Sequence, residues 1–457
     1  MQFRIEKGKR QKEQGKRQTL FTFYFLLFTL LSPGCRDKPV EEDSTQTVRK
    51  GDRRETKDEI RDTRDEIRET RSVEACISQA DLNYSRGRYD QAVSDYTEAI
   101  EINPGDAAIY YKRGNAYRAG GDYDEAIADY TKSIEIKPRY AEACYYRAIA
   151  CKAKGLNDQA ISDFTKALEI SPRLAEAYHN RGALYIAKEL YDEAIVDLDK
   201  AIEICPQYAM AHRDRGDAHK AKGQYDQAVF DYTRAVALTP TCAEAYYNRA
   251  FIYYQKGRHD LAISDFTKAI EARPAYAEAY CNRGAARITR GAYDEAIADC
   301  SKAIEMNPDY AEAYCNRGAV YFAKGLYDEA ISDCSKALEI NPQYAKACYN
   351  RAVAHHKKGQ YDRAISDLTR TLEIDPSDVR AYSRRAVAYA AKGEYDSVIA
   401  DYTKALEINP GLAVAYINRG IAHYKKGQYD QARQDVHKAQ ALGYEVQPAL
   451  LEALNTN

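Results

Sequence analysis

Ten of the thirteen prolines recur at intervals of 34 residues, and this spacing constrains the fold more than any other feature of the sequence. A fixed period of this length indicates one small structural unit that is copied and stacked, so that each copy contacts mainly its neighbours. The period divides residues 73–446 into eleven repeats, in which proline takes position 32. The repeats start at residues 73, 107, 141, 175, 209, 243, 277, 311, 345, 379 and 413.

Small and large residues alternate within a repeat at helical spacing. Position 8 is always Gly or Ala, position 20 is Ala in ten repeats, and large residues are frequent at positions 4 and 24. Such a pattern lets two helices approach closely. Position 15 is Gly in ten repeats, where a left-handed backbone ends the first helix, and Asp follows in the first turn of the second. The proline then ends the second helix. Each repeat is therefore predicted to be a helix, a turn and a second helix.

This pattern resembles the tetratricopeptide-repeat family over residues 73–446. The resemblance implies an all-α fold, a right-handed superhelical solenoid of eleven helix–turn–helix repeats. Two departures are the absence of Trp from position 4 and the presence of Arg, where the family usually has Leu, at position 7 of ten repeats. Position 23 is Asp in all eleven repeats. We predict that this Arg and this Asp pair within or between repeats; two independent solvent-exposed ladders are the alternative.

The residues before the repeats predict export. A basic stretch precedes the uncharged run from Leu20 to Ser32, whose 13 residues would span only about 20 Å as a helix. That length favours an export signal over residues 1–34 rather than a permanent membrane span. Cys35 follows Gly34 directly and resembles the acylated cysteine of bacterial lipoproteins, although Leu31 lies one residue further upstream than the lipoprotein motif requires. Simple secretion and an uncleaved anchor are the alternatives.

The flanking segments complete the predicted organisation. Residues 35–72 are charged and sparsely apolar, which is typical of a solvated tether. Residues 447–457 are expected to cap the last hydrophobic face with a short helix. The predicted location is the bacterial cell envelope, facing the periplasm or the surface, with the protein held by its lipid anchor.

Cysteine, histidine and charge give little sign of catalysis. Five cysteines take positions that Tyr or Phe fills in other repeats, so buried packing thiols are expected at Cys76, Cys144, Cys300, Cys334 and Cys348. Cys281 and Cys315 share position 5 of neighbouring repeats, where a bridge between them is the alternative to free thiols. The eight histidines predict no metal site, no motif predicts a cofactor or an enzyme, and a net charge of −2 argues against a nucleic-acid partner.

The family resemblance places a partner-binding groove on the first helices, at positions 2, 5, 9, 12 and 13. Aromatic side chains at these positions suit an extended segment or a helix whose side chains anchor in pockets. Packing onto the neighbouring helix is the alternative. The predicted groove residues are Tyr247, Phe251, Tyr254, Phe322 and Tyr349.

A basic carboxylate pocket is predicted near the C-terminal end of this groove. Position 2 is Glu in five of repeats 3 to 8 and then becomes Lys346 and Arg380, while Arg380 and Arg384 lie one helical turn apart. This resembles half of the dicarboxylate clamp of some tetratricopeptide co-chaperones; Cys315 and Ala319 stand where the other half would need Lys and Asn. The predicted pocket comprises Lys346, Asn350, Lys357, Arg380 and Arg384.

Together these features predict a non-catalytic scaffold that binds a protein or peptide segment with an acidic end. It would assemble or tether a complex at the membrane. Two alternatives stay open: an accessory subunit that recruits a polysaccharide or glycosyl-transfer enzyme system, and a self-associating spacer that forms homo-oligomers.

Overall fold

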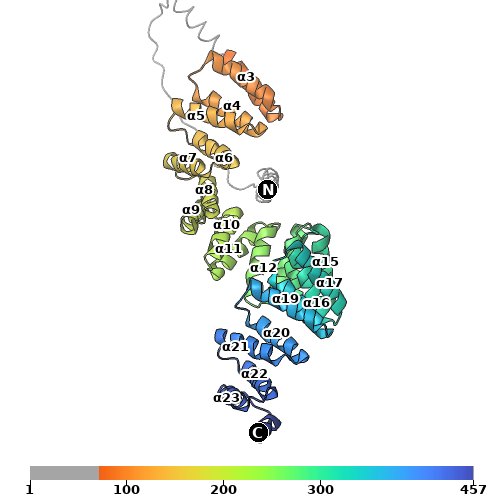
Figure 1. Ribbon diagram of the computed structural model, residues 1–457. Helices are drawn as coiled ribbons and strands as arrows, with labels where there is room; N and C mark the ends of the chain where they lie inside the picture. Colours follow the sequence, from red (N-terminus) through yellow and green to blue (C-terminus); the bar gives the residue numbers. More distant parts are fainter. Residues whose placement is uncertain (1–71, 456–457) are drawn as a thin grey trace, which may run out of the picture. The chain divides into compact units, whose positions relative to one another are not determined.

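The computed structural model describes residues 72–455, and every regular element in that range is a helix. Contacts divide the chain into two compact bodies, the N-terminal body up to Thr239 and the C-terminal body from Pro240 onward. Within each body the helices follow one another in pairs (Figure 1), one pair to each 34-residue repeat. The protein is an all-α repeat solenoid.

The N-terminal body begins with a helix over residues 72–85. Its further helices are α3 (Tyr89–Ile102), α4 (Ala107–Gly120), α5 (Tyr123–Ile136), α6 (Ala141–Ala153), α7 (Asn157–Ile170), α8 (Ala175–Ala187), α9 (Tyr191–Ile204), α10 (Ala209–Ala221) and α11 (Tyr225–Leu238).

The C-terminal body continues the same alternation. Its helices are α12 (Ala243–Gln255), α13 (His259–Ala272), α14 (Ala277–Thr289), α15 (Tyr293–Met306), α16 (Ala311–Ala323), α17 (Tyr327–Ile340), α18 (Ala345–Lys357), α19 (Tyr361–Ile374), α20 (Val379–Lys392), α21 (Tyr395–Ile408), α22 (Ala413–Lys425), α23 (Tyr429–Ala441) and α24 (Pro448–Asn455).

The turn inside each repeat uses a left-handed residue at position 15. The glycines there have φ between +71° and +97°, a region that an L-residue adopts only with strain. Repeat 4 has Glu189 at this position, with φ +60°. Repeat 4 therefore makes the same left-handed turn with glutamate in place of glycine.

Close approach of the two helices explains the small residue at position 8. A Cβ atom added to Gly216 would lie 2.8 Å from a ring carbon of Tyr232, and one added to Gly284 would lie 2.9 Å from the Sγ of Cys300. Tyr232 and Cys300 both occupy position 24 and are fully buried. The large side chain of the second helix therefore fills the space that the first helix leaves.

The predicted pairing of Arg at position 7 with Asp at position 23 is confirmed. In each of repeats 2 to 11, two guanidinium nitrogens bond the two carboxylate oxygens, with N–O distances of 2.6–3.0 Å. The guanidinium also reaches the preceding repeat, where Arg113 Nη1 donates to Thr97 Oγ1 at 2.9 Å. Asp side chains in these pairs are 1–10% exposed, so they are not an external ladder.

Four of the five cysteines that replace aromatic residues are buried, as predicted, whereas Cys76 in the first repeat is only partly buried. Cys144, Cys300, Cys334 and Cys348 are free thiols that are at most 1% exposed. Cys281 and Cys315 are likewise free thiols, so the alternative of a bridge between them is wrong.

The C-terminal end of the repeats is covered by α24. Leu454 is 2% exposed and packs in one cluster with Ile417, Val436 and Val446. Among the residues that the structure describes, no helix combines the length and apolar character needed to cross a membrane. The predicted export signal, the lipidation site Cys35 and nearly all of the predicted tether lie outside the described residues.

Candidate functional site

The inner face of each body is lined by the first helices of its repeats. Consecutive first helices contact each other: α8 contacts α10, α14 contacts α16, and α16 contacts α18. Side chains at positions 5, 6, 9 and 12 of these helices therefore form one continuous surface within a body. This surface is the candidate site.

A recurring trio of side chains joins successive first helices in the C-terminal body. Positions 5 and 34 of one repeat meet position 6 of the next. Asn282 Nδ2 donates to the hydroxyl of Tyr247 at 2.8 Å, and the ring of Tyr247 lies 4.9 Å from that of Tyr276. At the next two junctions Asn316 and Asn350 each donate to a cysteine Sγ at 3.4 Å. We call Asn282, Asn316 and Asn350 the asparagine rungs.

Sequence reasoning identified Asn350 and missed the other two rungs. The signal was present, because position 6 is Asn in six repeats: Asn180, Asn248, Asn282, Asn316, Asn350 and Asn418. The structure shows what the residue does at these junctions, because its Nδ2 bonds the side chain at position 5 of the preceding repeat and its Oδ1 can accept from a further side chain. Asn316 Oδ1, for example, accepts from Lys346 Nζ at 3.0 Å.

The predicted groove aromatics differ in how much surface they offer. Tyr254 lies 5.5 Å from the His259 ring and Phe322 lies 5.6 Å from the Tyr327 ring, each at the turn of its own repeat. The hydroxyl of Tyr247 accepts the hydrogen bond from Asn282, the first of the asparagine rungs. Phe251 is 36% exposed and offers the most open apolar surface of this group. The five predicted residues therefore do not converge on one pocket.

The exposure of Phe251 follows from position 24 of its own repeat. In repeats 2 and 5 the tyrosine hydroxyl at position 24 has an acceptor at position 9: Tyr232 donates to Asp217 Oδ1 at 2.6 Å and Tyr130 to Asn115 Oδ1 at 2.8 Å. In repeat 10 position 9 is Val387, and Tyr402 bonds Asn418 of the next repeat instead. Repeat 6 has Phe266 at position 24. Because Phe266 has no hydroxyl, position 9 is released from that role and an apolar side chain stands there.

The predicted basic pocket is an open cluster rather than a formed fork. Arg380 is 77% exposed, bonds the carboxylate of Asp378 at 3.2 Å and lies over the Tyr349 ring at 5.4 Å. Lys357 and Arg384 are exposed. Burial first, and then these two cations, lower the pKa of His356, which places the three groups close together. We call Lys346, Lys357, Arg380 and Arg384 the basic cluster.

The inner face of the N-terminal body carries an ionised version of the trio. His179 Nε2 bonds Asp214 Oδ2 at 2.8 Å, His179 Nδ1 bonds the Tyr208 hydroxyl at 3.0 Å, and Arg213 lies 2.6 Å from the other oxygen of Asp214. Burial opposes ionisation of Asp214, but Arg213 and His179 more than offset it and lower the pKa of Asp214 to about 2. The three positions match those of Tyr247, Tyr276 and Asn282.

This charged network extends along the same face. Lys152 Nζ donates to Asn180 Oδ1 at 2.9 Å, and burial lowers the pKa of Lys152. Burial, followed by the charge of Asp214, raises the pKa of Asp217. Burial also raises the pKa of Tyr208, so its hydroxyl remains protonated at neutral pH and is not activated as a nucleophile. Sequence reasoning missed this network, although repeats 3 to 5 replace neutral inner residues with ionisable ones.

Metal ligation has no support in the described part of the chain, which holds no group of three or more His, Cys, Asp or Glu side chains placed to bind an ion. His212 and His355 are both 6% exposed and lie in the packing between helices.

The fold and its inner face define a helical-repeat protein whose first helices present polar and aromatic side chains. Models described as tetratricopeptide repeat match residues 107–140, 141–174, 175–208, 243–276, 311–344, 345–378, 379–412 and 401–434, and one described as TPR repeat matches 80–118, 216–257 and 286–325. The chain belongs to the tetratricopeptide-repeat family.

Solved structures of the same class resemble it. MamA is 28% identical over 35% of this chain and 94% of its own, with a TM-score of 0.34. YrrB, a TPR protein with an unusual peptide-binding site, is 25% identical over 40% and 95%, with a TM-score of 0.36. Yeast Tom70 is 16% identical over 85% and 95%, with a TM-score of 0.39. No curated protein matches the chain.

Proposed function

We propose that the chain is a non-catalytic scaffold that holds an extended segment of a partner protein along the inner face of the C-terminal body. The asparagine rungs carry this proposal. Side-chain amides offer both donor and acceptor groups, and they recur here at three successive junctions of the body that also carries the exposed ring of Phe251. An extended backbone presents the complementary groups, and an apolar side chain can anchor on an exposed ring.

The charges on this face favour one direction for the segment. Position 2 is acidic in repeats 6 to 8 (Glu244, Glu278 and Glu312), whereas repeats 9 and 10 carry the basic cluster. A segment with an acidic end would therefore lie with that end toward repeats 9 and 10. Arg380 would exchange its bond with Asp378 for the incoming carboxylate.

The proposal also includes the cellular location of the protein. The basic and apolar residues before Cys35 support export and lipid anchoring at the cell envelope, where the repeats would assemble or tether a complex. Release of the protein from membranes by Cys35→Ser would agree with this location. Unchanged membrane association of that variant would rule out acylation at Cys35.

Photo-crosslinking in living cells tests the binding face. A photoreactive residue at Phe251 or Phe322 should give a discrete adduct, whereas one at Lys268 on α13 should not. Equal labelling from all three positions, or adducts only between copies of the chain, would favour a self-associating spacer over a receptor.

The direction of the segment needs a separate test on the partner so identified. Arg380→Glu together with Arg384→Glu should weaken binding by at least tenfold and reduce its dependence on salt. Lys268→Glu is the matched control. Unchanged affinity of the double variant would contradict the proposed direction while leaving the binding face intact.

A further inference from the structure

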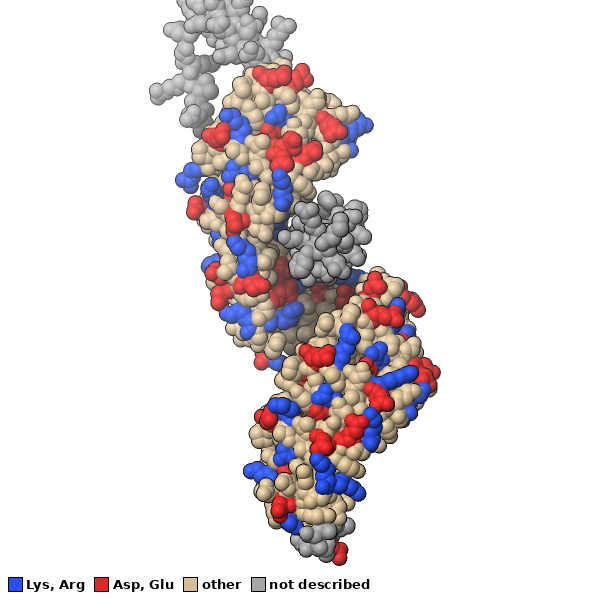
Figure 2. All heavy atoms as spheres, viewed as in Figure 1, with Lys and Arg blue, Asp and Glu red and all other residues tan. Residues whose placement is uncertain are grey.

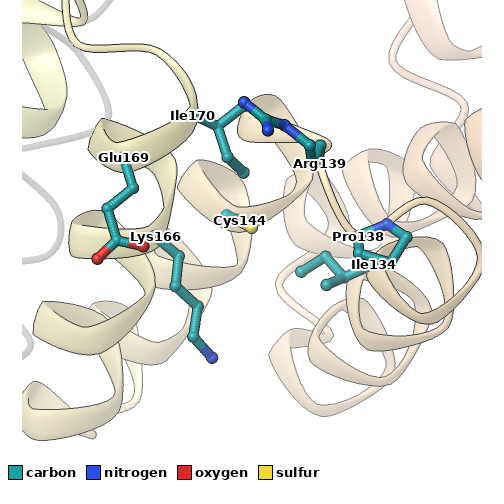
Figure 3. A pocket seen from close by; sticks show the side chains of 7 residues that line it. All are labelled: Ile134, Pro138, Arg139, Cys144, Lys166, Glu169 and Ile170. Atoms are coloured by element: carbon teal, nitrogen blue, oxygen red, sulfur yellow. The ribbon is translucent and has the colours of Figure 1, made fainter.

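A crevice opens at the junction of repeats 2 and 3, away from the inner-face trios. It has a volume of about 300 Å³ and is lined by Ile134, Pro138, Arg139, Cys144, Lys166, Glu169 and Ile170. Figure 3 shows Ile134 and Pro138 on one side, Lys166 and Glu169 on the other, and Cys144 between them. Cys144 is 1% exposed, so its thiol forms the floor.

Comparison with the other repeats explains why this space is empty of side chain. Cys144 takes position 4, which is Tyr in seven repeats: Tyr110, Tyr178, Tyr246, Tyr280, Tyr314, Tyr382 and Tyr416. In repeat 6 the ring of Tyr246 is 8% exposed and lies 5.5 Å from the ammonium of Lys268, at position 26. Repeat 3 keeps the lysine at position 26, Lys166, and lacks the ring. The crevice therefore lies beside the position at which repeat 6 packs a tyrosine ring against a lysine.

In two other repeats without this tyrosine, a side chain bonds the carbonyl oxygen of the proline at the same junction. Repeat 5 has His212, whose Nε2 lies 3.1 Å from the carbonyl oxygen of Pro206. Repeat 9 has Cys348, and there Arg370 at position 26 donates to the carbonyl oxygen of Pro342 at 2.8 Å, across the junction. Repeat 3 combines a small side chain at position 4 with lysine at position 26, which leaves the junction open.

We propose that this crevice binds the side chain of a tyrosine presented by a partner protein. The walls supply aliphatic carbon from Ile134, Pro138 and Ile170, and Lys166 stands at the position whose lysine lies over the Tyr246 ring in repeat 6. The mouth is open and carries the exposed charges of Arg139, Lys166 and Glu169, which suit a ring borne on a protein surface. A ring supplied by a second chain would complete the packing that this repeat lacks.

Binding of the ring itself is tested with p-cresol, which is the tyrosine side chain as a free molecule. Saturation-transfer NMR on the full-length protein should show p-cresol binding. Cys144→Tyr should fill the crevice and reduce the signal at least fivefold. Lys166→Arg should do the same without enlarging a buried residue, because it reproduces the bridge that Arg370 makes. Lys200→Arg is the control, since Tyr178 already occupies that junction.

Crosslinking distinguishes a protein-borne ring from a free phenol. An aliphatic diazirine residue at Glu169 should capture, in cells, a peptide that contains tyrosine next to the crosslinked site. The same residue at Glu203, the matching position of repeat 4, should capture none. Absence of p-cresol binding, equal binding by Lys166→Arg and the parent, or a captured peptide without tyrosine would each overturn the proposal. All of these readouts are independent of Phe251 and the asparagine rungs.

Discussion

Two junctions, one in each body, use the same three positions between successive first helices in opposite ways, although Asn180 and Tyr145 of the N-terminal body also form the neutral contact. In the C-terminal body Tyr247, Tyr276 and Asn282 form a neutral trio, while in the N-terminal body His179, Tyr208 and Asp214 form an ionised one. A carboxylate held by His179 and Arg213 is satisfied within the protein. At the partly exposed Asn282 and Asn350, the neutral amide joins its neighbour with one bond and keeps capacity for a ligand, whereas Asn316 is buried and also bonds Lys346. The ionised face is therefore suited to stability and the neutral face to recognition.

Removing the buried charge should have the largest effect. Asp214→Asn places opposite His179 the asparagine that the other junctions have at position 6, but it removes the carboxylate that bonds Arg213. We expect a loss of about 3 kcal/mol, the usual cost of breaking a buried ion pair from one side. Hydrogen exchange in α8 and α10 measures it. Asn282→Ala, which removes one neutral hydrogen bond, should cost only about 1 kcal/mol in α12 and α14. Equal losses of stability from Asp214→Asn and Asn282→Ala would contradict the proposed difference between the ionised and neutral faces.

Low pH should likewise destabilise the N-terminal body, which contains Asp214, more than the C-terminal body. The pKa of Asp214 is lowered from 3.8 to about 2, so its stabilisation is complete above pH 4 and is lost as the pH falls through about 2. A shift of this size corresponds to about 2 kcal/mol. Pepsin cleavage within residues 175–221 should therefore accelerate between pH 4 and pH 2 in the parent protein. In Asp214→Asn that acceleration should disappear, and its persistence would assign the acid sensitivity to another group.

The sequence predicted the helices and turns of the repeats, but it did not predict the contacts on their inner faces. Period, glycine at position 15 and small residues at position 8 determine the helices, because these features act within one repeat. The pairing of Arg at position 7 with Asp at position 23 was also predictable, since opposite charges recur in phase. The asparagine rungs and the His179–Asp214 contact join residues 35 positions apart in different repeats. A residue-by-residue reading of one repeat does not show which side chains meet across that distance.

The coupling between positions 9 and 24 gives a sharper test of why Phe251 is exposed. Phe266→Tyr adds a buried hydroxyl opposite an apolar side chain. The Nδ2 of Asn282 already donates to Tyr247, so the new hydroxyl lacks the contact that Asn418 gives Tyr402 in repeat 10, and the substitution should destabilise α12 and α13 by about 1–2 kcal/mol. Adding Phe251→Asn supplies the acceptor that Asn115 gives Tyr130, so the double variant should recover about 1 kcal/mol of that loss. Hydrogen exchange of α12 and α13 in the single and double variants measures the coupling. Additive effects would show that Phe251 is exposed for some other reason.

The smallest effect is expected at the turn of repeat 4, inside the ionised region. Glu189 is the described non-glycine residue with positive φ, whereas Gly223 makes the same turn in repeat 5 at φ +73°. Glu189→Gly should stabilise the N-terminal body by about 0.5–1 kcal/mol, because the left-handed strain is removed and only part of the gain is offset by a more flexible unfolded chain. Gly223→Ala should cost about 1 kcal/mol by the reverse argument. Urea unfolding of both variants measures these changes. If Glu189→Gly instead destabilised the protein, the glutamate side chain would have to contribute contacts that outweigh its backbone strain, and the ionised face would then extend to the turn.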